Sequence, residues 1–169
     1  MHLQTESTAT LQMIPEGVAG IEATLSAMSR FSKAGKKSMQ VRDMALSLIR
    51  DCPSKDWACQ VRALHAFVRD SIQYVLDPVD VELVQEPETT LRLRAGDCDD
   101  KSVLLASLLG SIGHPARYCA IGFEPGIFCH VYVETKIGAN WIPLETTEPV
   151  EVGWEPPPAL VRCRLFKDA

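Results

Sequence analysis

Residues 96–112 read Gly-Asp-Cys-Asp-Asp-Lys-Ser-Val-Leu-Leu-Ala-Ser-Leu-Leu-Gly-Ser-Ile and form the most informative part of the chain. From Val103 to Ile112 nearly every side of a helix would carry an apolar residue, which is typical of a buried central helix. Gly113-His114-Pro115 then ends the helix, because the residue before a proline avoids helical backbone angles. A cysteine, Cys98, stands among three aspartates at the start of this helix.

The segments on either side differ in periodicity. Before residue 96, apolar residues at helical spacing predict three helices, at 17–30, at 38–51 and from about 54 to 72. After residue 115, alternating patterns separated by glycine turns predict strands at 116–123, 127–135 and 141–147. Helices followed by antiparallel strands indicate an α+β fold with one globular domain.

Three further segments flank these elements. We expect residues 1–16 to be an irregular arm and the tail around residues 156–158, three prolines, to lie extended over the surface. The long acidic connection 77–96 is expected to cover a cleft, because long loops in compact domains are often functional.

Composition excludes several classes of protein. The chain has 169 residues, of which 46% are hydrophobic and 23% charged, so a sizeable core is expected rather than disorder. The net charge of −5 argues against nucleic-acid binding. No apolar run reaches the length of a membrane span, and the first 20 residues lack a signal-peptide pattern. We therefore expect a cytoplasmic protein with no membrane or nucleic-acid partner.

The chain has six cysteines, which is many for its length. An even number is compatible with disulfides, but without a secretion signal we expect free thiols. No CxxC pair supports a zinc site. A metal site built from Asp97, Cys98, Cys129 and His130 is disfavoured, because neighbouring strand residues point to opposite faces. We expect neither a metal nor another cofactor.

Cys98 is the candidate nucleophile. A thiol at a helix N-terminus is acidified by the helix dipole, whereas adjacent aspartates raise its pKa, so it needs an imidazole partner. His130 is the best partner on the strand pattern. For a hairpin turning at residues 137–138, His130 lies directly opposite Glu145, where the carboxylate orients the ring.

Plainer interpretations of the same residues stay open. Cys98 is equally compatible with an inert position whose acidic neighbours only cap the helix, and His130 with an ordinary strand histidine. The other histidines are weaker candidates: His65 is expected to be half-exposed on its helix, and His114 precedes a proline in a turn.

Three motifs in order resemble the transglutaminase-like superfamily of papain-related folds: Gly96-Asp97-Cys98-Asp99-Asp100, His130-Val131-Tyr132-Val133-Glu134, and Trp141-Ile142-Pro143-Leu144-Glu145-Thr146-Thr147. The resemblance covers about residues 38–150. It implies an N-terminal arm and helix over 1–37, a catalytic domain over 38–169, and a nucleophile helix packed on the antiparallel sheet. In its compact form with N-terminal helices, the chain resembles the small members of this superfamily that phages and prophages carry.

The resemblance also implies roles for individual residues. Cys98 matches the family nucleophile and His130 its general base and acid, whereas Glu145 stands where the family usually has aspartate. The family's oxyanion hole combines the nucleophile's own N–H with an upstream side chain, which Gln73 or Tyr74 would supply. The candidates for the substrate cleft are Asp97, Asp99, Tyr132 and Trp141.

The implied reaction is attack of the Cys98 thiolate on an amide or peptide bond, giving a thioester that water hydrolyses. The substrate would be a peptide or protein. One alternative is transfer of the acyl group to an amine, as in protein cross-linking. The other is a catalytically silent module that binds phage structural proteins, which would make the protein virion-associated.

Overall fold

The computed structural model describes residues 17–77 and 83–169. Five helices and six strands are found in these two ranges. The helices are α1 (Val18–Gly35), α2 (Met39–Leu48), α3 (Trp57–Ser71), α4 (Pro87–Leu93) and α5 (Cys98–Ser111). The strands are β1 (Gln73–Tyr74), β2 (Ala95–Gly96), β3 (Ala116–Gly122), β4 (His130–Ile137), β5 (Asn140–Leu144) and β6 (Cys163–Asp168).

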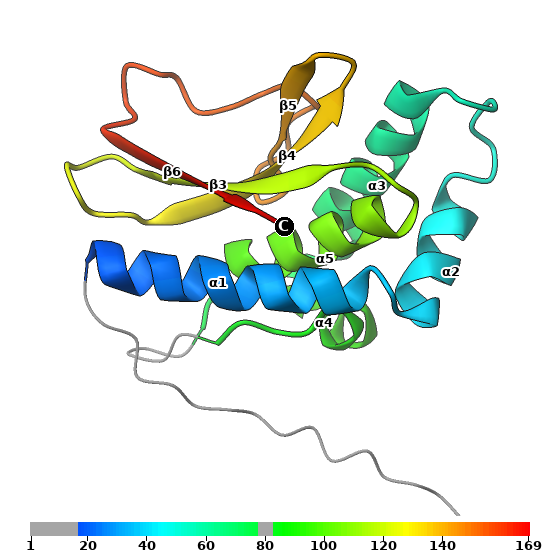
Figure 1. Cartoon of the computed structure of the whole chain (residues 1–169), viewed down its shortest axis with the longest axis horizontal. Coiled ribbons are helices and arrows are strands. Elements are labelled where there is room, and N and C mark those ends of the chain that lie inside the picture. Colours follow the sequence, from blue (N-terminus) through cyan, green and yellow to red (C-terminus); the bar gives the residue numbers. More distant parts are fainter. Residues whose placement is uncertain (1–16, 78–82) are drawn as a thin grey trace, which may run out of the picture.

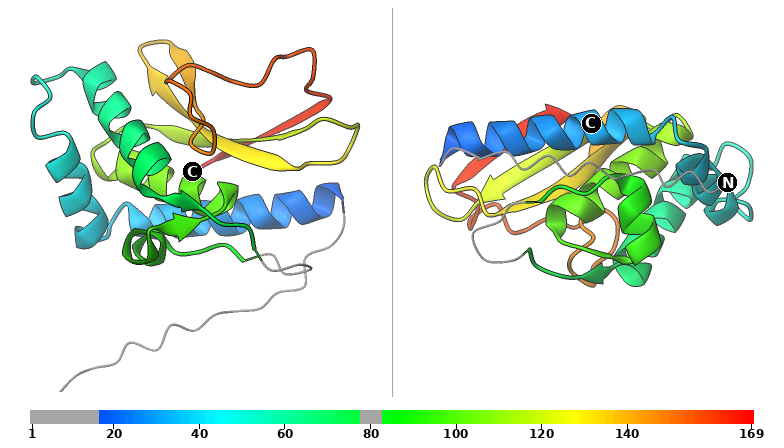
Figure 2. Two further views of the ribbon diagram at one scale, coloured as in Figure 1. Left: turned by 180° about the vertical axis from the view of Figure 1, so that it is seen from behind. Right: turned by 90° about the horizontal axis from the view of Figure 1, so that it is seen from below.

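The molecule has a sheet layer and a helix layer, with α5 between the sheet and the other helices (Figures 1 and 2). The four longer strands form an antiparallel sheet in the order β5-β4-β3-β6. Helix α1 runs along α5 and also contacts β6, while α2, α3 and α4 each pack on α5. The predicted α+β architecture, with a central helix packed on a C-terminal antiparallel sheet, is confirmed.

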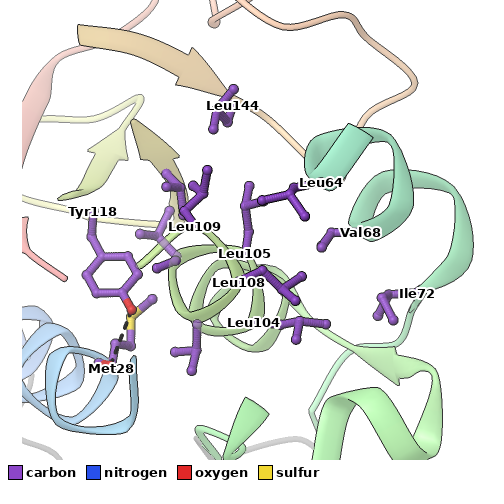
Figure 3. Close-up of a cluster of buried hydrophobic side chains, with 14 of the residues drawn as sticks. Met28, Leu64, Val68, Ile72, Leu104, Leu105, Leu108, Leu109, Tyr118 and Leu144 are labelled. Atoms are coloured by element: carbon purple, nitrogen blue, oxygen red, sulfur yellow. Dashed lines mark hydrogen bonds between the residues drawn. The ribbon is translucent and has the colours of Figure 1, made fainter. Parts of the chain in front are cut away.

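The core surrounds α5, as the apolar pattern predicts. Leu104, Leu105, Leu108 and Leu109 have no accessible surface and face different neighbours (Figure 3). The side chains packed around them come from α1, α3, β3 and β5: Met28, Leu64, Val68, Ile72, Tyr118 and Leu144. Because Leu25 and Met28 of α1 belong to this same cluster, the N-terminal helix is part of the core. The arm expected at 1–16 lies outside the described residues.

Two elements were not expected from the sequence. The connection 77–96 contains α4, whose Thr90 and Leu91 are buried against the helix layer, so residues 83–96 do not cover the sheet side of the molecule. The tail contains β6, which pairs with β3 from Arg117↔Asp168 to Gly122↔Cys163. The prediction of a tail merely lying on the surface is wrong for this segment, because it completes the sheet.

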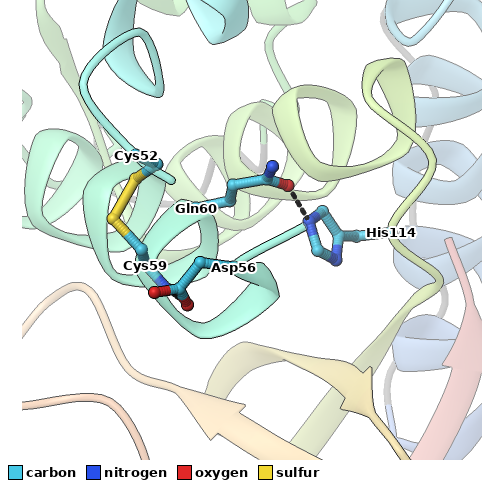
Figure 4. The surroundings of a disulfide bond; sticks show 5 residues. All are labelled: Cys52, Asp56, Cys59, Gln60 and His114. Carbon is cyan, nitrogen blue, oxygen red and sulfur yellow. Dashed lines mark hydrogen bonds between the residues drawn. A yellow bond between two sulfur atoms is a disulfide. The ribbon is translucent and has the colours of Figure 1, made fainter. Parts of the chain in front are cut away.

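The corner between α2 and α3 corrects the prediction of six free thiols. Cys52 and Cys59 form a disulfide with Cα atoms 5.7 Å apart (Figure 4). The side chain of Asp56 accepts a hydrogen bond from the Cys59 N–H at 2.9 Å and thereby starts α3. This cap turns Cys59 back over the end of α2, within the distance that a disulfide requires. Cys98, Cys119, Cys129 and Cys163 are free.

Within the described ranges, no helix combines the length and apolar character needed to cross a membrane.

Candidate active site

Cys98 is the first residue of α5, and a reciprocal cap fixes its backbone. The Asp97 carboxylate accepts hydrogen bonds from the N–H groups of Asp99 and Asp100, at 2.9 and 3.2 Å. In return, the Asp100 carboxylate accepts from the Asp97 N–H at 3.3 Å. This capping box satisfies N–H groups that a helix otherwise leaves without partners. The aspartates around the thiol therefore have a structural task, and they position Cys98 at the positive end of α5.

The environment of the thiol favours its protonated form. Burial is the main cause that raises the pKa of Cys98, and the charges of Asp99 and Asp97 raise it further. A hydrogen bond with the backbone of Val131 acts in the opposite direction but is outweighed. The Sγ atom donates to Asp99 Oδ1 at 3.5 Å. The acidifying effect expected from the helix N-terminus therefore does not prevail, and Cys98 is a neutral thiol at pH 7.

His130 begins β4 and contacts the predicted carboxylate. Its Nε2 atom lies 2.6 Å from Oε2 of Glu145, a side chain that is only 1% exposed. The other oxygen, Oε1, accepts from the backbone N–H and the hydroxyl of Thr147, at 2.6 and 2.7 Å. Burial alone would raise the pKa of Glu145, but the hydrogen bonds from His130 and Thr147 hold it below its usual value.

An ionised Glu145 fixes the tautomer of the imidazole. A carboxylate accepts hydrogen bonds, so Nε2 of His130 carries the proton and Nδ1 keeps a free electron pair when the ring is neutral. His130 directly precedes Val131, whose backbone contacts Cys98. The structure therefore brings the start of α5 to the strand that carries His130.

The register of the hairpin differs from the expected one by two residues. Val133 pairs with Leu144, whereas a turn centred at 137–138 would have paired it with Ile142. An even offset keeps every side chain on its predicted face, and the His130 and Glu145 side chains still meet. Extending the register past Val133↔Leu144, the last β4–β5 pair, makes these two residues diagonal neighbours. A diagonal pair is farther apart than a directly opposed pair, about 7–8 Å between backbones. The long side chain of glutamate suits this separation.

Two residues that sequence analysis did not select hold this region from α3 and α5. Glu145 lies beyond the last β4–β5 pair, and its carbonyl instead contacts Nε2 of His65 at 2.5 Å. The expectation that His65 is half-exposed is wrong, since it is 1% exposed, and burial lowers its pKa. The second residue is Lys101, 2% exposed, whose ammonium donates to the carbonyl of Ile72 at 2.8 Å. The only sequence signal for this contact was the position of Lys101, one helical turn after Cys98.

The two candidates for the oxyanion hole form β1, which pairs in parallel with β2 so that Tyr74 lies opposite Gly96. Tyr74 interacts electrostatically with the surroundings of Cys98. Burial raises the pKa of its phenol to about 12, and the negative charges of Asp97, Asp99 and Glu145 add to this effect. The phenol is therefore neutral and able to donate a hydrogen bond. Tyr74 lines the same cleft as His130, whereas Gln73 is not among the lining residues.

This cleft has a volume of about 580 Å³. Cys98 itself is partly buried and is not among its lining side chains. Residues 147–160 form one wall, whereas no residue of the described part of 77–96 lines the cleft, so the expectation that 77–96 covers it is wrong for the described residues. The residues that line it are Tyr74, Phe123, Cys129, His130, Glu145, Thr147, Glu148, Val150, Trp154, Pro156, Pro157 and Leu160.

The four residues expected in a substrate cleft have different positions. Asp97 and Asp99 flank Cys98 at the start of α5. Tyr132 is 1% exposed, and its hydroxyl donates to Glu155 at 3.0 Å, so it supports the wall from behind. Trp141 lies near the other end of β5, where it lines a separate cleft of about 400 Å³ and stacks on Arg117.

The only group of side chains with metal-ligand spacing in the described part of the chain consists of three consecutive residues. Ligand atoms of Asp97, Cys98 and Asp99 lie within 4.8 Å of one another. The Asp97 carboxylate, however, caps α5, and the thiol is protonated and bonded to Asp99. The arrangement is explained by the helix start without an ion.

Comparison with known proteins identifies the family of the chain. The model of the transglutaminase-like superfamily matches residues 42–146, a range that contains Cys98, His130 and Glu145. No curated protein matches the chain.

Among solved structures, the fold resembles a "putative protease" from Parabacteroides distasonis ATCC 8503, with a TM-score of 0.57 and 17% identity over 73% of this chain. It also resembles a "putative cysteine protease" from Cytophaga hutchinsonii, with a TM-score of 0.54 and 24% identity over 66% of this chain. The matches span 26% and 38% of those longer chains. Because the family model matches more than half of the chain, the chain belongs to the transglutaminase-like superfamily.

Proposed function

We propose that the protein is a cysteine hydrolase that cleaves an amide or peptide bond with Cys98, His130 and Glu145. The observation that carries the proposal is the 2.6 Å contact between His130 Nε2 and an ionised, buried Glu145. The next residue of the same strand, Val131, contacts Cys98 through its backbone. This contact leaves Nδ1 as the basic atom of the ring. A histidine with only a structural role in a strand would not require a buried carboxylate whose two oxygens both accept hydrogen bonds.

The raised pKa of Cys98 determines the first step. Because the thiol is protonated at rest, His130 removes its proton as Sγ attacks the carbonyl carbon. A carbon–sulfur bond forms and the carbonyl oxygen becomes an oxyanion. The N–H of Cys98 and the neutral phenol of Tyr74 are the donors proposed to stabilise this charge.

The following steps regenerate the enzyme. His130 gives its proton to the amine, the carbon–nitrogen bond breaks, and a thioester on Cys98 remains. His130 then deprotonates a water molecule that attacks the thioester, and the carboxylic acid leaves as the thiol is restored. Glu145 stabilises the imidazolium in each half-reaction. No step requires a metal or an organic cofactor.

The experiment is to trap the acyl-enzyme with N-acetylglycine p-nitrophenyl ester, followed by acid quenching and mass spectrometry of each cysteine. We expect the acyl group on Cys98 ahead of the other free cysteines, and acylation about 10²–10⁴-fold slower in His130→Ala. The Cys98→Ala variant provides the blank. In water with added glycinamide, free acid is the expected main product.

Two results would overturn the proposal. Acylation spread evenly over cysteines and lysines, and unchanged in His130→Ala, would identify a silent module with the family's fold. An amide with glycinamide as the main product would replace hydrolysis by acyl transfer.

A further inference from the structure

The cleft beside His130 exposes large apolar side chains from three separate segments. Tyr74, Phe123, Trp154 and Leu160 are 44%, 46%, 39% and 57% exposed, and all four line the cleft. Val150, Pro156 and Pro157 extend the same surface. Soluble proteins rarely gather exposed apolar surface in one place without a binding task. The chemistry of this surface indicates what lies in the cleft during the reaction.

The wall is held in place before any ligand binds. Arg69 of α3 donates to the Val150 carbonyl at 2.7 Å and forms an ion pair with Glu151 at 3.0 Å. The N–H of Gly153 donates to the carbonyl of Pro143 in β5 at 2.9 Å. These bonds attach the segment before Trp154 to α3 and to the sheet.

The segment after Trp154 is attached as well. Glu155 accepts from Tyr132 and from Arg164, each at 3.0 Å. Two prolines then follow within the wall, where their fixed φ angles restrict the backbone. A wall anchored on both sides of Trp154 is a preformed apolar subsite, and preformation lowers the cost of binding.

The charged groups at the cleft are acidic. Glu145 and Glu148 line it, and no lysine or arginine is among the described lining residues. Asp97 and Asp99 add negative charge next to Cys98 and act on Tyr74. A substrate with a carboxylate near the scissile amide would be repelled, whereas a neutral or cationic neighbour would be accepted.

We propose that the cleft selects peptides with an aromatic or large aliphatic side chain within two residues of the scissile amide and rejects acidic residues there. Trp154 and Leu160 are the specificity-determining residues. The proposal rests on the proposed function, because it places the peptide beside His130. In this proposal the segment 147–160 selects the substrate, a role that is separate from the chemistry of Cys98, His130 and Glu145.

The test uses acetyl-dipeptidyl chloromethyl ketones in two series, with phenylalanine, leucine, alanine, lysine or glutamate at either position. In the labelling reaction a bond forms between Cys98 Sγ and the methylene carbon, chloride leaves, and the thiol proton passes to His130. The rate of labelling at Cys98 is read by mass spectrometry. An acetylglycine chloromethyl ketone, which has no side chain to fit the cleft, measures the reactivity of Cys98 alone.

We expect the phenylalanine and leucine probes of at least one series to label Cys98 about tenfold or more faster than the alanine probe. The glutamate probe should be slower than alanine. Trp154→Ala and Leu160→Ala should each reduce this preference when every rate is divided by the rate of the acetylglycine probe on the same variant. Trp57→Ala, which removes an exposed tryptophan outside the cleft, is the matched control.

Equal rates for phenylalanine, alanine and glutamate probes would overturn the inference while leaving the proposed function intact, provided that the acetylglycine probe labels Cys98 in a His130-dependent manner. Without that dependence the proposed function fails first. Should Trp154→Ala not fold, Trp154→Phe and Leu160→Ala decide the question, and an unchanged preference in both contradicts the role of the wall.

Discussion

At the scale of single residues, the protonated resting state of the Cys98 thiol determines how the reaction begins. Thiols at helix N-termini are often acidic, yet here burial, Asp99 and Asp97 raise the pKa. Asp97 also positions the thiol, because its side chain caps the start of α5. A protonated thiol makes the imidazole indispensable, and it protects the cysteine against alkylation and oxidation, which require the thiolate.

The contact between His130 and Glu145 was predicted from the sequence, but the residues that hold Glu145 in place were not. The contact with Glu145 follows from alternation and turn position, although the predicted register was off by two residues. Alternation fixes only the face of a strand, and any even offset satisfies it. Thr147 and His65, which hold Glu145, were not predicted, because no local pattern encodes a contact between α3 and the end of β5.

The diagonal geometry leads to a prediction for Glu145→Asp. The shorter side chain restores the residue more usual in the superfamily, but here it has to span a diagonal pair. We expect the 2.6 Å contact to be lost and acylation of Cys98 to slow by about 10²-fold or more. Stopped-flow acylation checks this, with Glu22→Asp on the exposed face of α1 as control. A rate equal to wild type would show that the register does not require glutamate.

Asp100 provides a prediction about pH and stability. Burial raises its pKa to about 7, with Asp97 and Asp77 adding to the effect, although hydrogen bonds from Gln85 and Asp97 oppose it. Since the folded-state pKa exceeds the usual unfolded value near 4, the folded protein binds the extra proton. Its contribution to stability is therefore complete below about pH 4 and is lost as pH rises to about 7.

Thermal unfolding between pH 4 and 8 measures this contribution. Relative to Asp100→Asn, which does not titrate, the wild type should lose stability by a few kcal/mol across that range. Asp43→Asn on exposed α2 should leave the wild-type slope unchanged. Parallel curves for wild type and Asp100→Asn would contradict the assignment.

Among the elements, α3, β1 and α5 are connected through Lys101. Its buried ammonium donates to the carbonyls of Ile72 and Arg69 at the C-terminal end of α3, directly before the β1 strand that carries Tyr74. A cation is favourable at a helix C-terminus, and the charges of Glu145 and Asp70 partly offset the burial that lowers the pKa of Lys101. One side chain thus links α5, which begins with Cys98, to the end of α3 that precedes β1.

Removal of this ammonium should affect both stability and rate. Lys101→Met leaves buried carbonyls without a partner and should cost about 1–3 kcal/mol of unfolding free energy. It should also slow acylation, because β1 loses its anchor. Chemical denaturation and acylation rates are the measurements, and Lys33→Met, which removes an exposed ammonium from α1, is the comparison. Equal losses in the two variants would argue against an anchoring role.

Elements with strong periodicity were predictable, and short ones were not. The apolar surface of α5 and the alternation in β3 and β4 indicated their types correctly. Helix α4 begins with Pro87 in an acidic connection and spans only seven residues, and β6 is an edge strand whose Phe166 is 43% exposed. Both are stabilised by tertiary contacts with α5 and β3, which local sequence does not reveal.

For the whole molecule, the disulfide is the main feature that composition alone missed. Trp57, the first residue of α3, is 52% exposed and packs on the ring of His114, with the ring centroids 5.3 Å apart. His114 in turn bonds Gln60 of α3 at 3.0 Å (Figure 4). The α2–α3 corner is therefore built from contacts and a covalent bond rather than from an apolar stripe.

Reduction of Cys52–Cys59 should destabilise the fold without altering the chemistry. For a loop of this length, chain entropy gives roughly 2–3 kcal/mol, a fall in Tm of about 5–10 °C. Calorimetry with and without dithiothreitol measures the shift, and a double variant, Cys52→Ser with Cys59→Ser, should be insensitive to it. A changed acylation rate in that double variant would mean that the corner affects the active site.

The central claim is that Cys98, His130 and Glu145 act as one unit, and a double-mutant cycle on the acylation rate of Cys98 tests it most directly. The rates of wild type, His130→Ala, Glu145→Gln and the double variant are compared at one pH. If Glu145 acts only through His130, the double variant is no slower than His130→Ala alone, as for residues that function together. Two results would contradict the account. One is a double variant whose rate loss equals the product of the two single losses, and the other is a Glu145→Gln variant as fast as wild type.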